Sequence, residues 1–320
     1  MKAACCLLLA ASIIPFCDGP VPNRGAELVY RAVAEPAPEP EQLEQARAVI
    51  ERRLQALDIP GAGVRLDEKQ RLVVRIPGGE ELDRVKRACQ RRGELIFAPV
   101  DDAGTRFVQE RFDQAGADEK QRPQPAAGAA AEPATELPAG VVLQHEHLAE
   151  AGDAYYLRAD DRQALQEAVA GLAAAVPDGY RLLLGQQQGS RGETWWRTYL
   201  VAKDAWPAGE HVTEAQVQQD PHVGLPQVAV TFDAAGAEQF AALTADLVKR
   251  RLAIAVDDRI HSAPMVQERI TGGRAVITLG AAGNFDRLQA QAETLAAVLE
   301  GGKLPVPLEL ASERGYGPPR

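Results

Sequence analysis

The order of strand-like and helix-like segments constrains the fold of this chain more than any other feature of its sequence. Between residues 26 and 101, apolar alternation and helical spacing predict a strand, a helix, two strands, a helix and a strand. The predicted segments are 27–33, 40–57, 63–66, 72–76, 80–92 and 94–100. A βαββαβ order is typical of a ferredoxin-like module, in which two helices cover one face of a four-stranded sheet. We therefore expect an α+β fold with such a module over 26–101.

A related order recurs towards the C-terminus. It predicts strands at 227–232, 252–256, 259–266 and 304–310, with helices at 234–251 and 284–299. We expect a second α+β module over 150–311, closed by the last of these strands and followed by a flexible tail at 312–320. Ala, Pro, Gly, Glu and Gln dominate 112–140, and this composition buries too little apolar surface to offset the entropy of ordering. We expect a flexible linker there.

The first 17 residues are typical of a secretory signal. Lys2 precedes an apolar run at 7–14 that is too short to span a bilayer, and Pro15 ends the run. Cys17 follows where a bacterial lipoprotein carries its acylated cysteine, and ordinary cleavage between 17 and 26 is the alternative. Both routes place the body outside the cytoplasm, in the periplasm or cell envelope.

Charge and cysteine content exclude several classes of function. Lys and Arg total 35 against 45 Asp and Glu, and the resulting net charge of -10 disfavours a nucleic-acid partner. Cys89 is the one cysteine beyond residue 17, so we expect neither an internal disulfide framework nor a cysteine-rich zinc site. Its place on the apolar face of a predicted helix indicates a core residue.

Three motifs near the C-terminus go beyond periodicity. They are Val230-Thr231-Phe232 followed by Gly236 and Phe240, Leu252-Ala253-Ile254 followed by Asp257 and Ser262-Ala263-Pro264, and Ile270-Thr271-Gly272-Gly273. In this order they resemble the first periplasmic domain of the SecD family, and the similarity continues through 292–308. Residues 48–57 and 72–78 are similar to the base of that domain. The resemblance thus implies a base over 26–101 and a head over 150–311.

The sequence departs from the SecD pattern in two places. Asp258 stands where the family's hairpin has Gly, so the Asp257-Asp258 turn is expected to form with side chains, which Asp tolerates better than most residues. The family also continues into membrane helices that couple proton flow to movement, whereas this sequence ends at Arg320. We therefore expect no proton transport by this chain itself.

The resemblance implies a protein that assists Sec-dependent export and is not an enzyme. It would bind unfolded or translocating polypeptide or a component of the Sec translocon, without a cofactor and without membrane contact other than a lipid anchor. The alternative is an envelope lipoprotein that keeps the fold but has no role in secretion. Within the resemblance, the structural motif residues at turns and bends are Asp257, Ser262, Ala263, Pro264, Gly272 and Gly273.

Two other motifs have the residue types of catalytic or metal sites. His261 and Ser262 follow Asp257, but neighbours on one strand point to opposite faces, so we expect no hydrolytic triad. His145 and His147 supply two of the roughly four ligands that a closed zinc site needs, which favours an exposed polar turn. Gly272-Gly273 lacks the Lys-Ser/Thr of a phosphate loop and indicates a tight turn.

An aromatic pair supplies the candidate polypeptide-binding residues. Strand alternation sends one of Trp195 and Trp196 inward and the other outward. An outward ring beside Tyr199 would contact an extended polypeptide, and packing in the core or at a sheet edge is the alternative.

Overall fold

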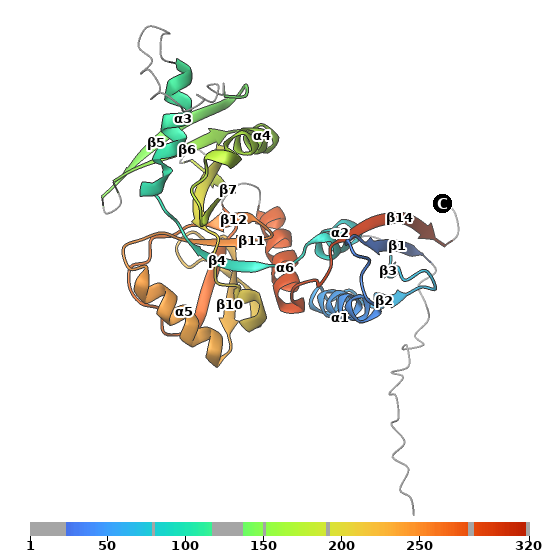
Figure 1. The fold of residues 1–320 in the computed structure, drawn as a ribbon. Coiled ribbons are helices and arrows are strands. Elements are labelled where there is room, and N and C mark those ends of the chain that lie inside the picture. The colour runs from blue at the N-terminus through green and yellow to red at the C-terminus, as the bar shows by residue number, and fades with distance from the viewer. Residues whose placement is uncertain are drawn as a thin grey trace, which may run out of the picture.

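The computed structural model describes residues 24–78, 81–116, 137–149, 152–189, 193–280 and 285–317. The strands form three sheets, and helices pack against them, which confirms the predicted α+β class (Figure 1). The helices are α1 (Pro40–Ala56), α2 (Leu82–Gln90), α3 (Arg106–Gly116), α4 (Arg162–Leu172), α5 (Ala234–Asp246) and α6 (Phe285–Gly301). The strands are β1 (Gly25–Ala32), β2 (Gly63–Leu66), β3 (Leu72–Pro77), β4 (Leu95–Pro99), β5 (Val141–Leu148), β6 (Gly152–Ala159), β7 (Tyr180–Gln188), β8 (Thr194–Ala202), β9 (Val212–Gln219), β10 (Pro226–Phe232), β11 (Leu252–Val256), β12 (Arg259–Ser262), β13 (Arg274–Thr278) and β14 (Leu308–Tyr316).

The first sheet joins the two ends of the described chain, and we call it, with α1 and α2, the terminal module. Its strand order is β14-β1-β3-β2, and every neighbouring pair is antiparallel. α1 begins at Pro40, whose fixed φ suits the first helical position, and Glu39 and Gln42 form a reciprocal capping box there. Apolar residues of α1 such as Ile50 pack against Leu28 and Val74 of the sheet.

The largest sheet has the order β4-β11-β12-β7-β8-β6-β5 and curls on itself. Val100, just after β4, forms an isolated bridge with Val201 of β8, and the Asp101 amide donates a hydrogen bond to Leu200 O at 2.9 Å. The strands β4, β11, β12, β7 and β8 therefore surround a buried interior, and we call them the barrel. β5 and β6 continue past β8 and carry α3 and α4 (Figure 1).

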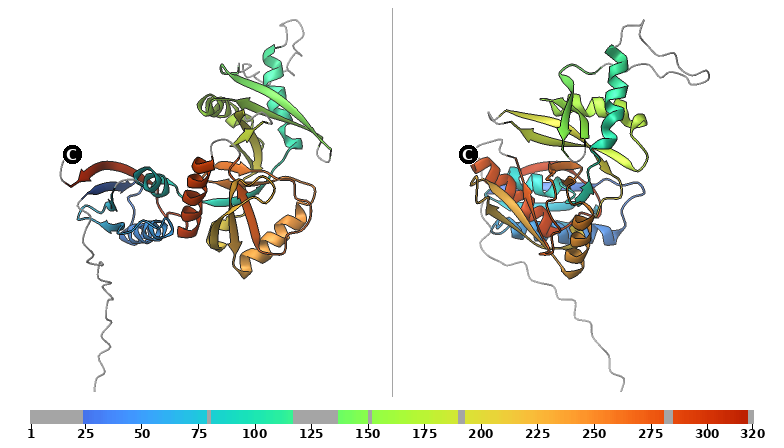
Figure 2. Two further views of the ribbon diagram at one scale, coloured as in Figure 1. Left: turned by 180° about the vertical axis from the view of Figure 1, so that it is seen from behind. Right: turned by 90° about the vertical axis from the view of Figure 1, so that its left-hand side faces the viewer.

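Helix α6 lies between the terminal module and the rest of the molecule (Figures 1 and 2). On one side Leu295 and Leu299 join the core between the barrel and the three-stranded sheet β13-β10-β9. On the other side Ala297 and Val298 join the core of the terminal module. One helix therefore contributes to two cores and fixes them against each other.

The strand predicted to close the first module is not part of it. β4 forms where the sequence predicts a strand, but it pairs with β11, and the place beside β1 is taken by β14. The reason is that β4 is apolar on both faces: Leu95 and Phe97 face one core, and Ile96 and Ala98 face the barrel interior. The second predicted module is likewise not one sheet, because β10 and β13 pair with each other and leave β11 and β12 to the barrel.

The predicted linker and tail also differ from the structure. The linker at 112–140 overlaps α3, which continues to Gly116, and residues 117–136 lie outside the described residues. The tail prediction at 312–320 is wrong in its first part, since residues 312–316 belong to β14. The predicted signal at 1–17, with Cys17, lies outside the described residues. Among the residues that are described, no helix has the length and apolar character that a bilayer crossing needs.

Candidate functional site

The candidate polypeptide-binding residues lie near the tip of the β7–β8 hairpin. The aromatic and β-branched run of β8 favours a strand, and its register pairs Trp196 with Gln186 and Trp195 with Gln187. Alternation places Trp195 and Tyr199 on one face of β8 and Trp196 on the other. The two tryptophans therefore present their rings on opposite sides of the hairpin.

Each tryptophan ring is stacked with arginine. The guanidinium carbon of Arg158 lies 4.2 Å from the ring centroid of Trp195. On the other face, the guanidinium carbons of Arg162 and Arg259 lie 5.2 and 4.9 Å from the ring centroid of Trp196. Both rings are half-buried, so each combines an apolar face with cationic neighbours, a pairing that is enriched at interfaces.

Tyr199 does not join this surface, and the prediction that it lies beside an exposed ring is wrong. Its side chain points into the barrel and the residue is 4% exposed. Its hydroxyl accepts a hydrogen bond from Gln187 Nε2 at 2.8 Å, and burial raises the pKa of the phenol. The ring packs beneath the Arg197 guanidinium, whose carbon lies 4.7 Å from the ring centroid.

A partly buried network of charges at one end of the barrel connects β5 to β8. Arg197 of β8 donates to Glu146 of β5 at 3.0 Å, and Arg251 approaches the same carboxylate at 3.6 Å. Arg251 also donates to both oxygens of Asp102, with 2.9 Å between Nε and Oδ2. These partners are far apart in sequence, which is why motif reasoning missed the network. Its paired charges are a structural connection between strands.

The β11–β12 hairpin adopts the turn that the sequence implies. Asp257 and Asp258 have φ values of 54° and 61°, the left-handed conformation that a two-residue type I′ turn requires at both positions. Asp257 Oδ1 accepts a hydrogen bond from the Glu94 amide at 3.0 Å, which fastens the turn to the start of β4. Asp258 therefore adopts the left-handed turn conformation where the SecD pattern has Gly, as expected from the sequence.

The Ser262-Ala263-Pro264 segment is a bend that returns the chain to β11. β12 ends at Ser262, and Pro264 O then accepts a hydrogen bond from the Leu252 amide at 3.0 Å. Beyond the bend, Met265 bridges to Arg251. The segment thus continues the pairing with β11 after an irregularity in the strand.

His261 and Ser262 have no geometry for hydrolysis. Within the described residues, His261 Nε2 and Ser262 Oγ are buried and have no hydrogen-bond partner. Burial lowers the pKa of His261 to about 3, and the charges of Arg259 and Arg91 lower it further in the same direction. A triad base needs a pKa near neutral pH and a carboxylate that orients its ring. His261 is much less basic and has no hydrogen-bonded carboxylate among the described residues, so it does not fit this role.

The two glycines before β13 have different roles. Gly273 has a left-handed φ of 60°, and its carbonyl accepts a hydrogen bond from the Phe232 amide at 2.9 Å. A Cβ atom there would lie 2.7 Å from Cβ of Ala237, whereas a Cβ on Gly272 would meet nothing within 4 Å. The turn therefore depends on Gly273.

His145 and His147 lie on β5, so the prediction of a polar turn there is wrong. Both are exposed; His147 Nδ1 lies 2.8 Å from Asp153 Oδ1, and the His145 ring stacks on Tyr155. Across the part of the chain that the structure describes, no group of three or more His, Cys, Asp or Glu side chains is placed to hold a metal ion.

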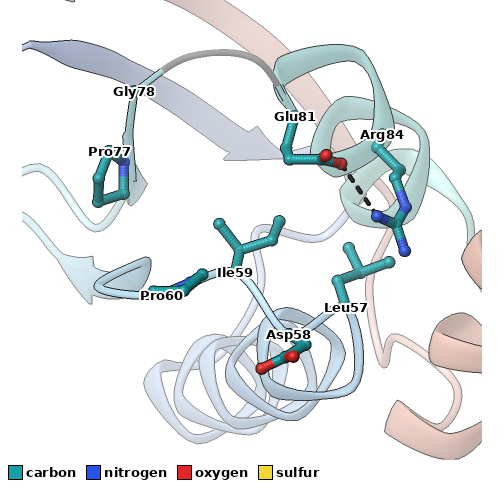
Figure 3. Close-up of a pocket in the computed structure, with 8 residues that line it drawn as sticks. All are labelled: Leu57, Asp58, Ile59, Pro60, Pro77, Gly78, Glu81 and Arg84. Carbon is teal, nitrogen blue, oxygen red and sulfur yellow. Dashed lines mark hydrogen bonds and ion pairs between the residues drawn. The ribbon is translucent and has the colours of Figure 1, made fainter.

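Two adjoining hollows that the sequence did not predict lie at the edge of the terminal module. The first, of about 230 Å³, lies between the turn after α1 and the turn before α2 (Figure 3). Its lining includes Leu57, Ile59, Pro60, Pro77, Glu81 and Arg84. The second, of about 470 Å³, shares Leu57 and Arg84 and extends to β9 and α6. Arg84 forms ion pairs with Glu81 at 3.0 Å and with Glu293 of α6 at 2.9 Å, so its side chain connects the two hollows.

Comparison with known proteins identifies relatives of this arrangement. Residues 184–306 match the family model described as SecDF, P1 head subdomain. Protein translocase subunit SecD of Calditerrivibrio nitroreducens is 39% identical over 120 residues, which cover 38% of this chain and 22% of that protein. Protein translocase subunit SecDF of Thermus thermophilus is 27% identical over 296 residues, which cover 92% of this chain and 30% of that protein.

A solved structure shares the fold. It is that of SecDF, described as a membrane component that enhances protein export, and it superposes with a TM-score of 0.51 at 24% identity. The superposition covers 89% of this chain and 98% of that chain. The curated relatives are longer, since the chain spans from 20% to 45% of the length of the SecD proteins that it matches.

Proposed function

We infer that this chain carries a periplasmic domain of the SecD family, and on that premise we propose that it acts outside the cytoplasm as an accessory factor in protein export. The observation that supports the proposal is the combined likeness of the chain: a SecDF head subdomain over 184–306, and a SecDF fold across 89% of its length. A fold alone does not fix a function, so the proposal depends on the family match as well as on the superposition. The accessory role requires no chemical reaction by this chain.

The role we propose for the chain is to bind unfolded or translocating polypeptide at the tip of the β7–β8 hairpin. Trp195 with Arg158 and Trp196 with Arg162 offer half-buried rings beside cations on the two faces of the hairpin. Aromatic and arginine side chains dominate binding energy in protein interfaces. Gln186 and Gln187 lie opposite the tryptophans. Gln186 Oε1 is bonded to Arg259 and Gln187 Nε2 to Tyr199, so the other amide groups, Gln186 Nε2 and Gln187 Oε1, would be the ones to bond a peptide backbone. Such a surface suits many sequences, as an export factor requires.

Two further parts of the proposal concern partners and location. The chain would also contact a component of the Sec translocon, because its relatives are translocase subunits. An acyl group on Cys17 would hold it at the membrane surface. Mass spectrometry of the protein isolated from membranes tests the acylation, and its outcome leaves the polypeptide-binding proposal unaffected.

Fluorescence anisotropy tests the polypeptide-binding proposal. Labelled unfolded polypeptides without a signal sequence are titrated with the purified chain from Ala26 to Arg320 and with its Trp195→Ala and Trp196→Ala variants. We expect saturable binding that at least one of these variants weakens about tenfold, or about 1.4 kcal/mol. Tyr155→Ala, which removes a half-buried aromatic ring on β6 instead, is the control and should bind like the parent. No binding at concentrations up to about 1 mM would favour an envelope protein without a role in secretion.

A further inference from the structure

Three arginines without carboxylate partners have charges that act on one another. Arg91 follows α2, Arg162 begins α4 and Arg259 begins β12. Among the described residues none of the three has an Asp or Glu oxygen within 4 Å, whereas the arginines at one end of the barrel and beside α6 are ion-paired. In a chain with a net charge of -10, a group of unpaired cations requires an explanation.

Trp196 holds two of these cations near each other. The guanidinium carbons of Arg162 and Arg259 lie 5.2 and 4.9 Å from the centroid of its ring. Arg259 is oriented further because its NH2 group donates to Gln186 Oε1 at 2.9 Å. Its Nε is buried and has no hydrogen-bond partner among the described residues. The ring thus forms an apolar wall beside donors whose hydrogen-bonding capacity is unused.

His261 adds an unused polar atom to the same region. Its Nε2 is buried without a partner in the described structure, one residue beyond Ile260, which packs inside the barrel. Burial lowers the pKa of His261, and the charges of Arg259 and Arg91 act in the same direction.

The cations also repel one another. Burial lowers the pKa of Arg259 to about 10, with further contributions from Arg91 and Arg162. The carboxylate of Asp257 opposes the effect of burial on the pKa of Arg91. The other acid of the turn, Asp258, is already paired with Arg181 at 3.0 Å. An added anion would relieve the repulsion that remains around Trp196.

We propose that Arg91, Arg162, Arg259 and His261 form a binding site for a phosphate group, supplied by free phosphate or by the headgroup of an anionic phospholipid. A phosphate carries up to two charges and several acceptor oxygens, which matches several guanidinium forks better than a single carboxylate does. The Trp196 wall limits water on one side of the site and thereby strengthens the contact. This inference goes beyond the proposed function, because it requires no polypeptide.

Titration with inorganic phosphate tests the site directly. The full chain is titrated at constant ionic strength, with chloride as the reference anion, while thermal unfolding and the ring signals of His261 are followed by calorimetry and NMR. We expect saturation below about 1 mM, a higher Tm and a rise of about one unit in the pKa of His261. Arg162→Gln, an exposed position, should weaken phosphate binding at least about tenfold.

Two variants separate binding from stability. Without phosphate, Arg259→Gln should be at least as stable as the parent, because it removes a repelled charge, and it should not gain stability when phosphate is added. Arg158→Gln also removes a guanidinium stacked on a tryptophan, but on the face where only one cation is stacked, and should bind phosphate like the parent. No saturation up to about 1 mM, or equal losses in Arg158→Gln and Arg162→Gln, would overturn the site.

Vesicle flotation distinguishes the two sources of phosphate. The same proteins are mixed with vesicles of phosphatidylglycerol and phosphatidylcholine in equal parts, or of phosphatidylcholine alone. Flotation of the parent but not of Arg162→Gln with the anionic vesicles would identify a lipid headgroup. Binding of inorganic phosphate without flotation would identify free phosphate. The absence of both would refute the proposal, and neither assay depends on whether the chain binds polypeptide.

Discussion

Replacement of Arg53 by methionine tests how the terminal module is held together. Arg53 lies on α1 and is 0% exposed. Its NH1 group donates to Ala88 O at 2.7 Å and to Arg91 O at 2.5 Å, and its NH2 group donates to Arg92 O at 3.0 Å and Gly302 O at 2.6 Å. One guanidinium thus satisfies carbonyls at the end of α2 and just after α6, where helix ends leave acceptors without partners.

The magnitude follows from two opposing contributions. A hydrogen bond from a charged donor contributes about 2 kcal/mol, so the four bonds of Arg53 contribute about 8 kcal/mol. Burial lowers the pKa of Arg53 from 12.5 to about 10, which corresponds to a cost of about 3 kcal/mol for burying the charge. Methionine fills part of the volume but donates to none of these carbonyls; Arg92 O keeps a bond from the Leu304 amide at 2.7 Å. We therefore expect Arg53→Met to reduce the free energy of unfolding by about 5 kcal/mol.

Urea unfolding followed by circular dichroism measures this loss. Arg53→Lys keeps the charge but not the planar fork, and should lie between the parent and Arg53→Met. Arg47→Met is the matched control on the same helix: Arg47 pairs with Glu44 and Glu51 at the surface, so its loss should cost under about 0.5 kcal/mol. A loss of less than about 1 kcal/mol in Arg53→Met, or one no larger than in Arg47→Met, would refute the reasoning.

Three further predictions concern the turns and the buried histidine. Gly273→Ala should lower the free energy of unfolding in urea by about 2–3 kcal/mol, because the new methyl group meets Ala237 of α5 and the φ of Gly273 is left-handed. Gly272→Ala should change it by under about 0.5 kcal/mol. Equal losses would contradict the turn geometry. Asp257→Ala should lower the free energy of unfolding by about 1–2 kcal/mol, because it removes the hydrogen bond to the Glu94 amide at the start of β4. Asp258→Gly should leave the free energy of unfolding unchanged or raise it by about 0.5 kcal/mol, because its φ is left-handed. Thermal shifts of the same sign and size in both variants would contradict this difference. Burial lowers the pKa of His261 from 6.5 to about 3. Between about pH 3 and pH 6.5 the unfolded chain therefore binds a proton that the folded chain does not. The free energy of unfolding should be highest above pH 6.5 and about 2 kcal/mol lower at pH 5. Unfolding in phosphate-free buffer should show this fall in the parent and not in His261→Gln, and parallel pH curves would argue against it.

Local elements could be predicted from the sequence, but their partners could not. The helices α1, α2 and α6 and most strands lie where apolar spacing predicts them, since that spacing reports which face is buried. Periodicity does not state which strand a segment pairs with, and so β4 and β14 were each assigned to the wrong sheet. The consecutive apolar residues of β4 are a signal of burial on both faces that could have placed it between two cores.

The candidate site was predicted in part for similar reasons. Alternation on β8 placed the two tryptophans on opposite faces, but the burial of Tyr199 depends on the bridge between Val100 and Val201 that closes the barrel. Arginine is a residue type that usually lies at the surface, and the burial of Arg53 is explained by the carbonyls at the ends of α2 and α6. Contacts between residues that are distant in sequence decide all of these cases.

The pairing of β1 with β14 determines the order in which this molecule can fold. β1, β3 and β2 lie within the first 77 residues, whereas the strand that covers the outer edge of β1 begins at Leu308. A chain that emerges from its N-terminus therefore exposes that edge, a template for pairing with other strands, until nearly the whole sequence is available. Contacts of such long sequence separation also form slowly. The module that begins the chain is thus the last to be completed.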